Sequence, residues 1–290
     1  MLTMNWLLLT LLAVTSRATY SIATKILSHD VKVSPITQSL LLTAFAGLLS
    51  LALSPLIGGL SFTGLNHFLV PVILVICAQA VGNILYFKGM KNLDASTAQI
   101  AFSSILLWGT ILSVIFLNSI FSPLQLIGIV LLLIAILLVQ YNKGKIIFNR
   151  SFFYIVASAV FFAVFQVASA DLSKSLSIGT YLVLANLGPS LIIGVMYFNI
   201  IKKDFLLLKS QVKKTFAKTF FASGTSLLYF FFSYLAYTYA PSRGIVVVLL
   251  TTQVVLSVLF GIFFLKEKEN KVRKLSAGVL AFLAGVLIKS

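Results

Sequence analysis

The stretch from Tyr229 to Glu267, YFFFSYLAYTYAPSRGIVVVLLTTQVVLSVLFGIFFLKE, indicates the architecture of the protein because a less regular copy of it lies earlier in the chain. The copy runs from Tyr86 to Ser119, YFKGMKNLDASTAQIAFSSILLWGTILSVIFLNS. In each copy an apolar helix ends, a short break follows, and a second apolar helix begins. The breaks begin at Ala95 and Pro241, which are 146 positions apart (241 − 95). The sequence therefore predicts a repeated fold.

The composition indicates a membrane protein. Hydrophobic residues make up 60% of the 290 positions and charged residues only 10%, whereas soluble domains carry about 25% charged residues. Apolar stretches of about 20 residues, each long enough to cross a bilayer as a helix, recur along the chain. The first, from Asn5 to about Leu27, lacks the basic start of a signal peptide, so we interpret it as a membrane span. The expected fold class is an all-α membrane protein.

Ten transmembrane helices are expected from the alternation of apolar windows and breaks. They cover residues 5–27, 34–57, 66–88, 95–118, 122–141, 151–174, 177–200, 215–239, 242–265 and 274–288. The first five and the last five match in order, so we expect one five-helix repeat at 1–142 and a second at 150–290. Because five is an odd number, the second repeat enters the membrane from the opposite side, which predicts two inverted five-helix repeats.

Lys and Arg residues gather in alternate loops. Of the 22, 18 lie in or beside the loops after the odd-numbered helices, and only Lys174, Arg243 and Lys289 lie on the opposite side. Because basic loops face the cytoplasm, we expect a multi-pass protein of the cell inner (plasma) membrane with both termini outside the cytoplasm. This topology explains the net charge of +16, so the lipid bilayer is an expected partner and nucleic acid is not.

Polar side chains at bilayer depth are costly and usually face a bundle interior. Gln79, Asn83 and Tyr86 follow one another at i, i+4 and i+7, on one face of the third helix. At the repeat offset the first two correspond to Thr225 and Tyr229 in the eighth helix. We predict that these faces line a cavity for a small-molecule substrate. Hydrogen bonds between neighbouring helices are the alternative, and they need no ligand.

Further polar residues are expected to complete this chamber. Gln99 and Ser103 lie at i and i+4 in the fourth helix, with Trp108 about a turn further along. In the ninth helix the run Thr251-Thr252-Gln253 would contribute matching side chains. Trp108 fits a core or lipid-facing position equally well.

Arg17 is the most costly residue of the chain, because it lies near the middle of the first helix, where a charge costs about 2.5 to 3.5 kcal/mol. In the second repeat it corresponds to Gln166, and Tyr20 lies one turn away. We predict that Arg17 attracts a carboxylate or phosphate on the substrate and that Gln166 hydrogen-bonds the substrate's polar end. Snorkelling to the membrane surface or a structural hydrogen bond is the alternative.

Acidic residues are few, and none is expected deep in the membrane. Asp171 lies about 30 Å along its helix from the cytoplasmic side, so it should approach the external surface and pair with Lys174. The other five are expected in loops: Asp30, Asp94, Asp204, Glu267 and Glu269. Because no buried carboxylate is expected to carry protons, we predict facilitated transport or solute exchange rather than obligatory proton coupling.

Two loop motifs carry a family resemblance. The first repeat has Leu117-Asn118-Ser119 followed by a segment from Ser122 to Gly128, and the second has LLTTQVVLSVLFGIFFLKE before a Gly-bearing last helix. With ten expected spans in two repeats, the chain resembles an EamA-type member of the drug/metabolite transporter superfamily. The resemblance implies movement of small polar or amphipathic metabolites, such as amino acids or related compounds, outward by alternating access around a central cavity.

Other functions have less support from the residues. A flippase for a lipid or lipid-linked head group on the same scaffold is the main alternative, and a cavity that opens sideways between helices would favour it. An intramembrane enzyme lacks catalytic candidates, because His29 and His67 lie at helix ends and no HExxH motif occurs. No metal or cofactor is expected, and Cys77 is the single cysteine. A small-residue stripe at 277–285 suits packing within a monomer or a homodimer.

Overall fold

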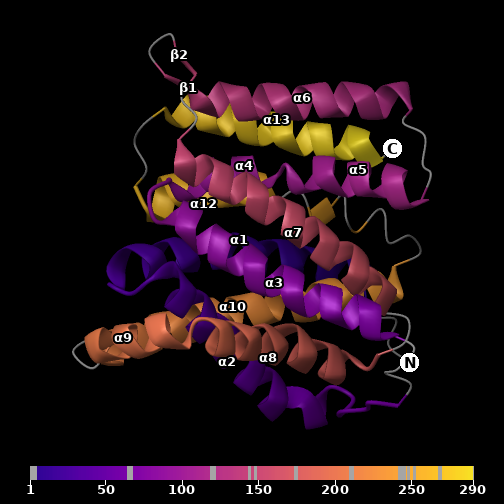
Figure 1. Cartoon of the computed structure of the whole chain (residues 1–290). Coiled ribbons are helices and arrows are strands. Elements are labelled where there is room, and N and C mark those ends of the chain that lie inside the picture. The colour runs from indigo at the N-terminus through magenta and orange to yellow at the C-terminus, as the bar shows by residue number, and fades with distance from the viewer. Residues whose placement is uncertain are drawn as a thin grey trace.

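The fold is a bundle of helices, seen in a computed structural model that describes residues 5–63, 68–117, 122–142, 145–146, 149–172, 176–208, 212–240, 246, 249–250, 253–266 and 270–289. The first half contains α1 (Trp6–Asp30), α2 (Pro35–Leu53), the 3₁₀ turn η1 (Ser54–Leu56), α3 (Leu69–Met90), α4 (Ala95–Phe102), α5 (Ile105–Leu117) and α6 (Pro123–Gln140). The second half contains α7 (Arg150–Leu172), α8 (Ile178–Met196), α9 (Phe198–Leu208), α10 (Val212–Tyr239), α12 (Gln253–Phe264) and α13 (Lys271–Lys289). A short antiparallel pair, β1 (Tyr141–Asn142) and β2 (Lys145–Ile146), lies between the halves (Figure 1).

Polar residues set the starts of three helices. The side chain of Asn5 accepts hydrogen bonds from the backbone of the first turn of α1, and Ser34 and Ser177 do the same for α2 and α8. Ser34 is followed by Pro35, which suits the first turn because it has no N–H that would need a partner there. These caps fix where each apolar segment enters the bundle.

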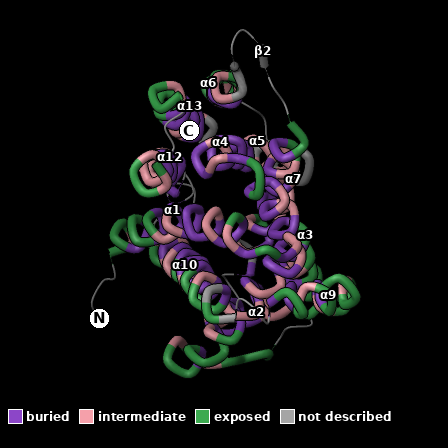
Figure 2. The backbone as a smooth tube through the Cα atoms, turned by 90° about the vertical axis from the view of Figure 1, so that its left-hand side faces the viewer, coloured by how far each residue is buried: buried purple, intermediate pink, exposed green. Residues whose placement is uncertain are grey.

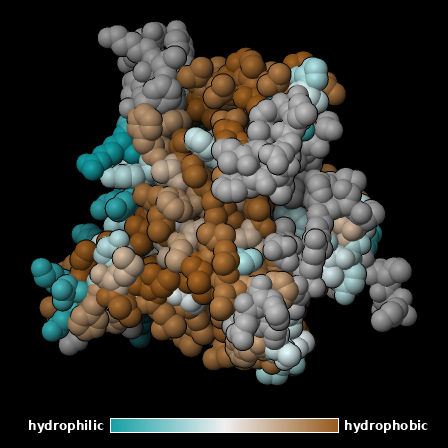
Figure 3. All heavy atoms as spheres, turned by 45° about the vertical axis from the view of Figure 1, so that its right-hand side comes forward, coloured by the Kyte–Doolittle hydropathy of each residue, from teal (hydrophilic) through white to brown (hydrophobic). Residues whose placement is uncertain are grey.

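Six helices in the described part of the chain are long and apolar enough to cross a membrane: α1, α2 continued by η1, α3, residues 150–169 of α7, α8, and residues 215–239 of α10. Their outer faces carry exposed hydrophobic side chains such as Leu8 and Val195. Figure 3 shows a broad apolar surface with hydrophilic side chains gathered along one edge. Such a surface suits lipid rather than water. The all-helical membrane fold is therefore confirmed, whereas the count of ten spans stays a prediction.

The predicted helix 95–118 is broken, and this expectation was wrong. The structure has two helices, α4 and α5, with Ser103 and Ser104 between them. At the break the N–H of Ser104 donates to the carbonyl of Ala101, and Ser103 Oγ donates to the carbonyl of Ile100 at 2.6 Å. Serine side chains that bind a carbonyl of the preceding turn bend helices. No glycine or proline marks this point in the sequence.

The segment between the expected helices 177–200 and 215–239 was expected to be a loop, but much of it is helical. It contains the end of α9 and the start of α10. Ile201 and Leu208, seven residues apart, are buried on one face of α9, while Lys203 is exposed. An apolar pair at this spacing lets a charged segment fold as an amphipathic helix.

Helices of the two halves pack against one another in pairs. The pairs are α1 with α10, α3 with α7, α2 with α8, α6 with α13, and α4 with α12. Figure 1 shows α6 and α13 along one side of the bundle, α2 and α8 along the other, and α1, α3, α7 and α10 between them. In Figure 2 buried residues face the inside of this arrangement and exposed residues face outward.

One end of the bundle, which we call the charged end, carries most of the described basic side chains. Exposed examples are Lys32, Lys91, Arg150, Lys202, Lys203, Lys213, Lys266 and Lys271. Contacts join the turns at this end: Asp30 with Lys218, Asn92 with Ser151, Asp94 with Lys274, and Asp204 with Ser34. The β1–β2 pair lies at this end, and Figure 1 marks both termini at the other, uncharged end.

Candidate functional site

Arg17 lies in the middle of α1, and its side chain is buried, with 4% exposure. Small residues such as Ala13, Ala18 and Ser21 are also buried on this helix, so neighbouring helices approach closely and the long side chain fills the space between them. Five aromatic rings surround the guanidinium. Its central carbon lies 4.8 Å from the ring centre of Tyr20, 4.9 Å from Phe102, 5.3 Å from Tyr229, and 5.8 Å from those of Tyr86 and Phe162.

These rings stabilise the charge inside the bundle. The negative face of an aromatic ring attracts a cation by about 0.5 to 2 kcal/mol, which offsets part of the cost of a charge at bilayer depth. The rings come from α1, α3, α4, α7 and α10, so both halves of the chain contribute. A snorkelling side chain would reach the surface, and the burial of Arg17 contradicts that alternative.

Hydrogen bonds extend this arrangement on α3 and α4. Tyr20 stacks on Tyr86 with ring centres 6.2 Å apart. The hydroxyl of Tyr20 donates to Asn83 Oδ1 at 3.5 Å, the long limit of a hydrogen bond, and Gln99 Nε2 donates to the hydroxyl of Tyr86 at 2.6 Å. We call the following residues the Arg17 cluster: Arg17, Tyr20, Asn83, Tyr86, Gln99, Phe102, Phe162 and Tyr229.

Several polar atoms in and beside the Arg17 cluster are buried and have no hydrogen-bond partner among the residues that the structure describes. They are Arg17 Nε, Asn83 Nδ2, Gln99 Oε1 and, one turn before Asn83 on α3, Gln79 Oε1. The three amide side chains are at most 1% exposed. Each buried polar group left unpaired costs about 1 to 3 kcal/mol. The cluster therefore holds donors and acceptors that a bound molecule could satisfy.

The structure brings together five of the residues predicted for the site: Arg17, Asn83, Tyr86, Gln99 and Tyr229. Two others are close along the same helices, but their hydroxyls already bind the backbone. Ser103 Oγ donates to Ile100, and Thr225 Oγ1 contacts the carbonyls of Phe221 and Ala222.

Three predicted site residues are not joined to the cluster by any hydrogen bond or ring contact among the described residues. Trp108 and Gln166 are half-buried, and Gln253 is buried. Within the described ranges, the indole N–H of Trp108 and the Oε1 of Gln253 have no hydrogen-bond partner. The neighbouring run at 251–252 lies outside the described residues, as do His67, Ser119, Lys174, Arg243 and the acids at 267 and 269. The side chain of Asp171 is also outside the description.

Sequence reasoning missed Phe102 and Phe162, because a phenylalanine in an apolar helix carries no polar signal. One available clue was spacing, since Phe102 follows Gln99 by three residues on α4. Another was Gly82 on α3. A Cβ atom at Gly82 would come within 3.0 Å of the Phe162 ring, so the glycine leaves room for that ring beside Arg17.

Carboxylates at the charged end tie the halves together. Asp30, the last residue of α1, pairs with Lys218 of α10, and Asp94 pairs with Lys274 of α13 at 2.6 Å. The sequence predicted loop positions for five acidic residues. That prediction was wrong for Asp204, which lies inside α9 and accepts hydrogen bonds from Ser34 and Thr37. Partial burial works against its charged form, yet these hydrogen bonds prevail and lower the pKa of Asp204 from its ordinary value.

Neutral hydrogen bonds tie the halves at the uncharged end. Thr180 Oγ1 accepts from the N–H of Ser61 at 2.8 Å and donates to its carbonyl at 2.9 Å. Ser177 Oγ donates to the carbonyl of Gly59 at 3.1 Å. A Cβ atom at Gly179 would lie 2.4 Å from the same carbonyl, so the backbones approach closely here. The Arg17 cluster is therefore enclosed between two sets of contacts that join the halves.

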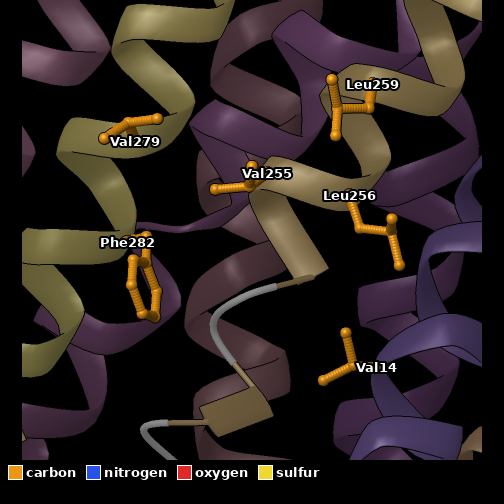
Figure 4. Close-up of a pocket in the computed structure, with 6 residues that line it drawn as sticks. All are labelled: Val14, Val255, Leu256, Leu259, Val279 and Phe282. Carbon is orange, nitrogen blue, oxygen red and sulfur yellow. The ribbon is translucent and has the colours of Figure 1, made fainter.

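An apolar groove of about 400 Å³ lies beside the cluster, between α1, α12 and α13. Figure 4 shows its six lining residues: Val14, Val255, Leu256, Leu259, Val279 and Phe282. Val279 is 41% exposed, so the groove faces outward from the bundle. A smaller hollow of about 280 Å³ at the charged end is lined by polar residues including His29, Lys32, Lys91 and Asp204.

Comparison with known proteins finds one family that the chain resembles. Residues 4–141 match the EamA-like transporter family. This stretch, just under half of the chain, is similar to an EamA-like transporter unit. The match confirms the resemblance to EamA-type members of the drug/metabolite transporter superfamily. No curated protein matches the chain.

The fold of this chain is shared with a solved structure over both halves. A solved structure described only as the crystal structure of a protein covers 97% of this chain, and 94% of its own length is covered. The two superpose with a TM-score of 0.65 at 15% sequence identity, which shows a shared fold and nothing beyond it. Because EamA-like proteins are transporters, membrane transport rather than catalysis is the activity that the family indicates.

Proposed function

We propose that this EamA-type protein moves small polar or amphipathic metabolites, such as amino acids or related compounds, across the membrane by alternating access to the Arg17 cluster. The observation that carries the proposal is the buried Arg17 guanidinium, held by rings from both halves and accompanied by unpartnered amide groups. Ionisable residues at bilayer depth mark substrate or ion pathways, because their cost must be offset by function or by a buried partner.

Two inverted five-helix repeats, at 1–142 and 150–290, would account for the packing. If each helix is replaced by its counterpart in the other repeat, the α1–α10 pair becomes the α7–α3 pair. The same replacement leaves the pairs α2–α8 and α6–α13 unchanged. In this scheme α4 and α5 together form one span. The first repeat starts at the uncharged end and finishes near β1–β2, and the second runs the opposite way (Figure 1).

The charged end would face the cytoplasm, because basic residues favour that side of the cell membrane. Both termini then lie outside, and the proposed direction of transport is export. The described carboxylates of Asp30, Asp94 and Asp204 all lie at the charged end and not in the cluster. This placement supports facilitated transport or solute exchange over obligatory proton coupling. A monomer would suffice, since Ala277 and Ala281 are buried within the chain.

Alternating access requires contacts that open at one end while the other end stays closed. The ion pairs at the charged end and the Thr180–Ser61 bonds at the uncharged end join opposite halves. Both sets are formed here, as they would be in an occluded state of the proposed cycle. Breaking one set would expose the cluster to one side of the membrane.

Flipping of a lipid or lipid-linked head group is the second candidate function. The apolar groove between α1, α12 and α13 favours it, because an acyl chain could lie there. Val14 of the groove is only one turn from Arg17 on α1. A head group at the cluster and a chain in the groove would then be carried together.

Side-specific labelling tests the proposed cycle without any ligand. Asn83→Cys is made in a Cys77→Ser background, and a membrane-impermeant maleimide is added from either side of reconstituted vesicles. We expect slow labelling from both sides, and faster labelling from the charged end after Asp30→Asn, because that end then opens more often. Leu8→Cys, on the lipid-facing surface, serves as the control. Labelling of Asn83→Cys from one side only would contradict alternating access.

A further inference from the structure

We infer that the substrate is a small organic anion, a carboxylate on an apolar or aromatic body with a hydrogen-bond donor, and not a cationic compound. This inference rests on the proposed function and concerns the same Arg17 cluster.

Charge is the first argument. None of the ion pairs among the described residues includes Arg17. The carboxylates of Asp30 and Asp94 bind Lys218 and Lys274, and that of Asp204 accepts three hydrogen bonds at the charged end. The guanidinium thus places a positive charge in a low-dielectric interior. An anion entering the cluster would be attracted, and a second cation would be repelled.

Hydrogen bonding is the second argument. Arg17 Nε–H and the Nδ2 group of Asn83 are buried donors without an acceptor in the described part of the chain. A carboxylate is an acceptor only, and it forms its strongest hydrogen bonds with a charged donor such as a guanidinium. Gln79 and Gln99 each lack a donor instead, because the Oε1 atom of each is a buried acceptor without a donor among the described residues. A hydroxyl or amide N–H on the same molecule would satisfy them.

The aromatic rings of the cluster indicate the chemistry of the rest of the substrate, and this is the third argument. Phe102, Phe162 and Tyr229 approach Arg17 from three different helices, and all three are at most 8% exposed. Such a wall would bury an apolar or aromatic group next to the anion. Rings of this kind also recognise quaternary ammonium ligands elsewhere, but here the chain's own arginine occupies the cationic position.

A matched probe panel tests the inference on purified full-length protein by thermal shift. Two bodies, phenylethyl and isobutyl, are each presented with a carboxylate, a primary amide or a trimethylammonium head, so 3-phenylpropionate is compared with 3-phenylpropionamide and phenethyltrimethylammonium. We expect the carboxylates to raise the Tm, with affinity at least tenfold above that of the amides, and the ammonium compounds to give no shift. The comparison uses the wild-type chain, so it needs no variant that folds.

Two variants then locate the binding. Arg17→Gln should abolish the carboxylate shift, whereas Arg150→Gln should keep it, because Arg150 is exposed and stacks on a single ring, that of Tyr154. Asn83→Leu, which preserves the arginine, should weaken the shift several-fold. Equal or stronger shifts with the amides or ammonium compounds, a carboxylate shift that survives Arg17→Gln, or no shift with any probe would overturn the inference. Labelling of Asn83→Cys from both sides would still stand in those cases, so failure of the anion and failure of alternating access are distinguishable.

Discussion

The Arg17 cluster and the charged end each contain a buried cation, but the groups around the two cations differ. At the charged end Lys274 is 4% exposed, as Arg17 is, but it binds the carboxylate of Asp94 at 2.6 Å. Arg17 is surrounded by rings, and its Nε has no acceptor. The chain thus pairs a buried cation where it joins helices and leaves another without an acid partner among the described residues. The difference separates a structural contact from a candidate binding site.

The largest expected effect comes from removing the cluster's charge. Arg17→Met should reduce binding of 3-phenylpropionate roughly 10- to 100-fold, because charge-assisted hydrogen bonds contribute about 1.5 to 3 kcal/mol. The free energy of unfolding should change by less than about 1 kcal/mol, since an unpaired buried charge is replaced by a side chain of similar length. Binding titrations and denaturant unfolding measure the two quantities. Arg150→Met is the control, and a large loss of stability with unchanged binding would assign Arg17 a structural role.

Breaking the Asp94–Lys274 pair at the charged end should lower the free energy of unfolding and leave ligand binding little changed. Asp94→Asn leaves the buried ammonium of Lys274 without its carboxylate, so the free energy of unfolding should fall by about 1 to 3 kcal/mol. Lys274→Met should cost less, because the Asp94 side chain is 47% exposed and can be hydrated. Chemical denaturation in detergent checks both variants. A larger loss from Lys274→Met than from Asp94→Asn would contradict this asymmetry.

Gly82→Ala tests whether the position of the Phe162 ring matters for the Arg17 cluster. Gly82→Ala brings a Cβ atom within 3.0 Å of Phe162, so it should displace that ring, weaken ligand binding several-fold and cost about 1 kcal/mol of stability. Gly224→Ala is the matched control, because nothing lies within 4 Å of its added Cβ. That change should stabilise α10 slightly, by up to about 1 kcal/mol. Equal effects of the two substitutions on ligand affinity would show that Phe162 does not contribute to ligand binding.

The smallest expected effect is a pH dependence at the charged end. The folded-state pKa of Asp204 lies below its ordinary value of 3.8, so its hydrogen bonds to Ser34 and Thr37 stabilise the fold fully above that value. The contribution is lost as the pH falls below 3.8 through the lowered pKa. The protection of α9 amides against hydrogen exchange, corrected for the pH dependence of the intrinsic exchange rate, should therefore be constant near neutral pH and fall only in strong acid. In Asp204→Asn this acid-dependent step should disappear, and its persistence would assign it to another group.

The sequence predicted the membrane fold and Arg17 for simple reasons. Charge is rare in apolar helices, so Arg17 was conspicuous, and the i, i+4 spacing marked Asn83. Phe102 and Phe162 were missed because an aromatic residue in an apolar helix looks the same whether it faces a cation or lipid. The break at Ser103 and the helical α9 were missed because each depends on local hydrogen bonding or tertiary burial. Trp108, Gln166 and Gln253 match the polar pattern, yet they are not joined to the cluster in the described structure.

The most direct test of the account locks one end and measures access from the other. Ser61→Cys and Thr180→Cys, placed where these residues are hydrogen-bonded, would form a disulfide across the uncharged end in the Cys77→Ser background. In the variant that also carries Asn83→Cys, oxidation should join the cysteines at 61 and 180 and leave the thiol at 83 free. We predict labelling of position 83 from the charged end only, and labelling from both sides after reduction. Unchanged access from the locked side would contradict a central site that the two halves expose in turn.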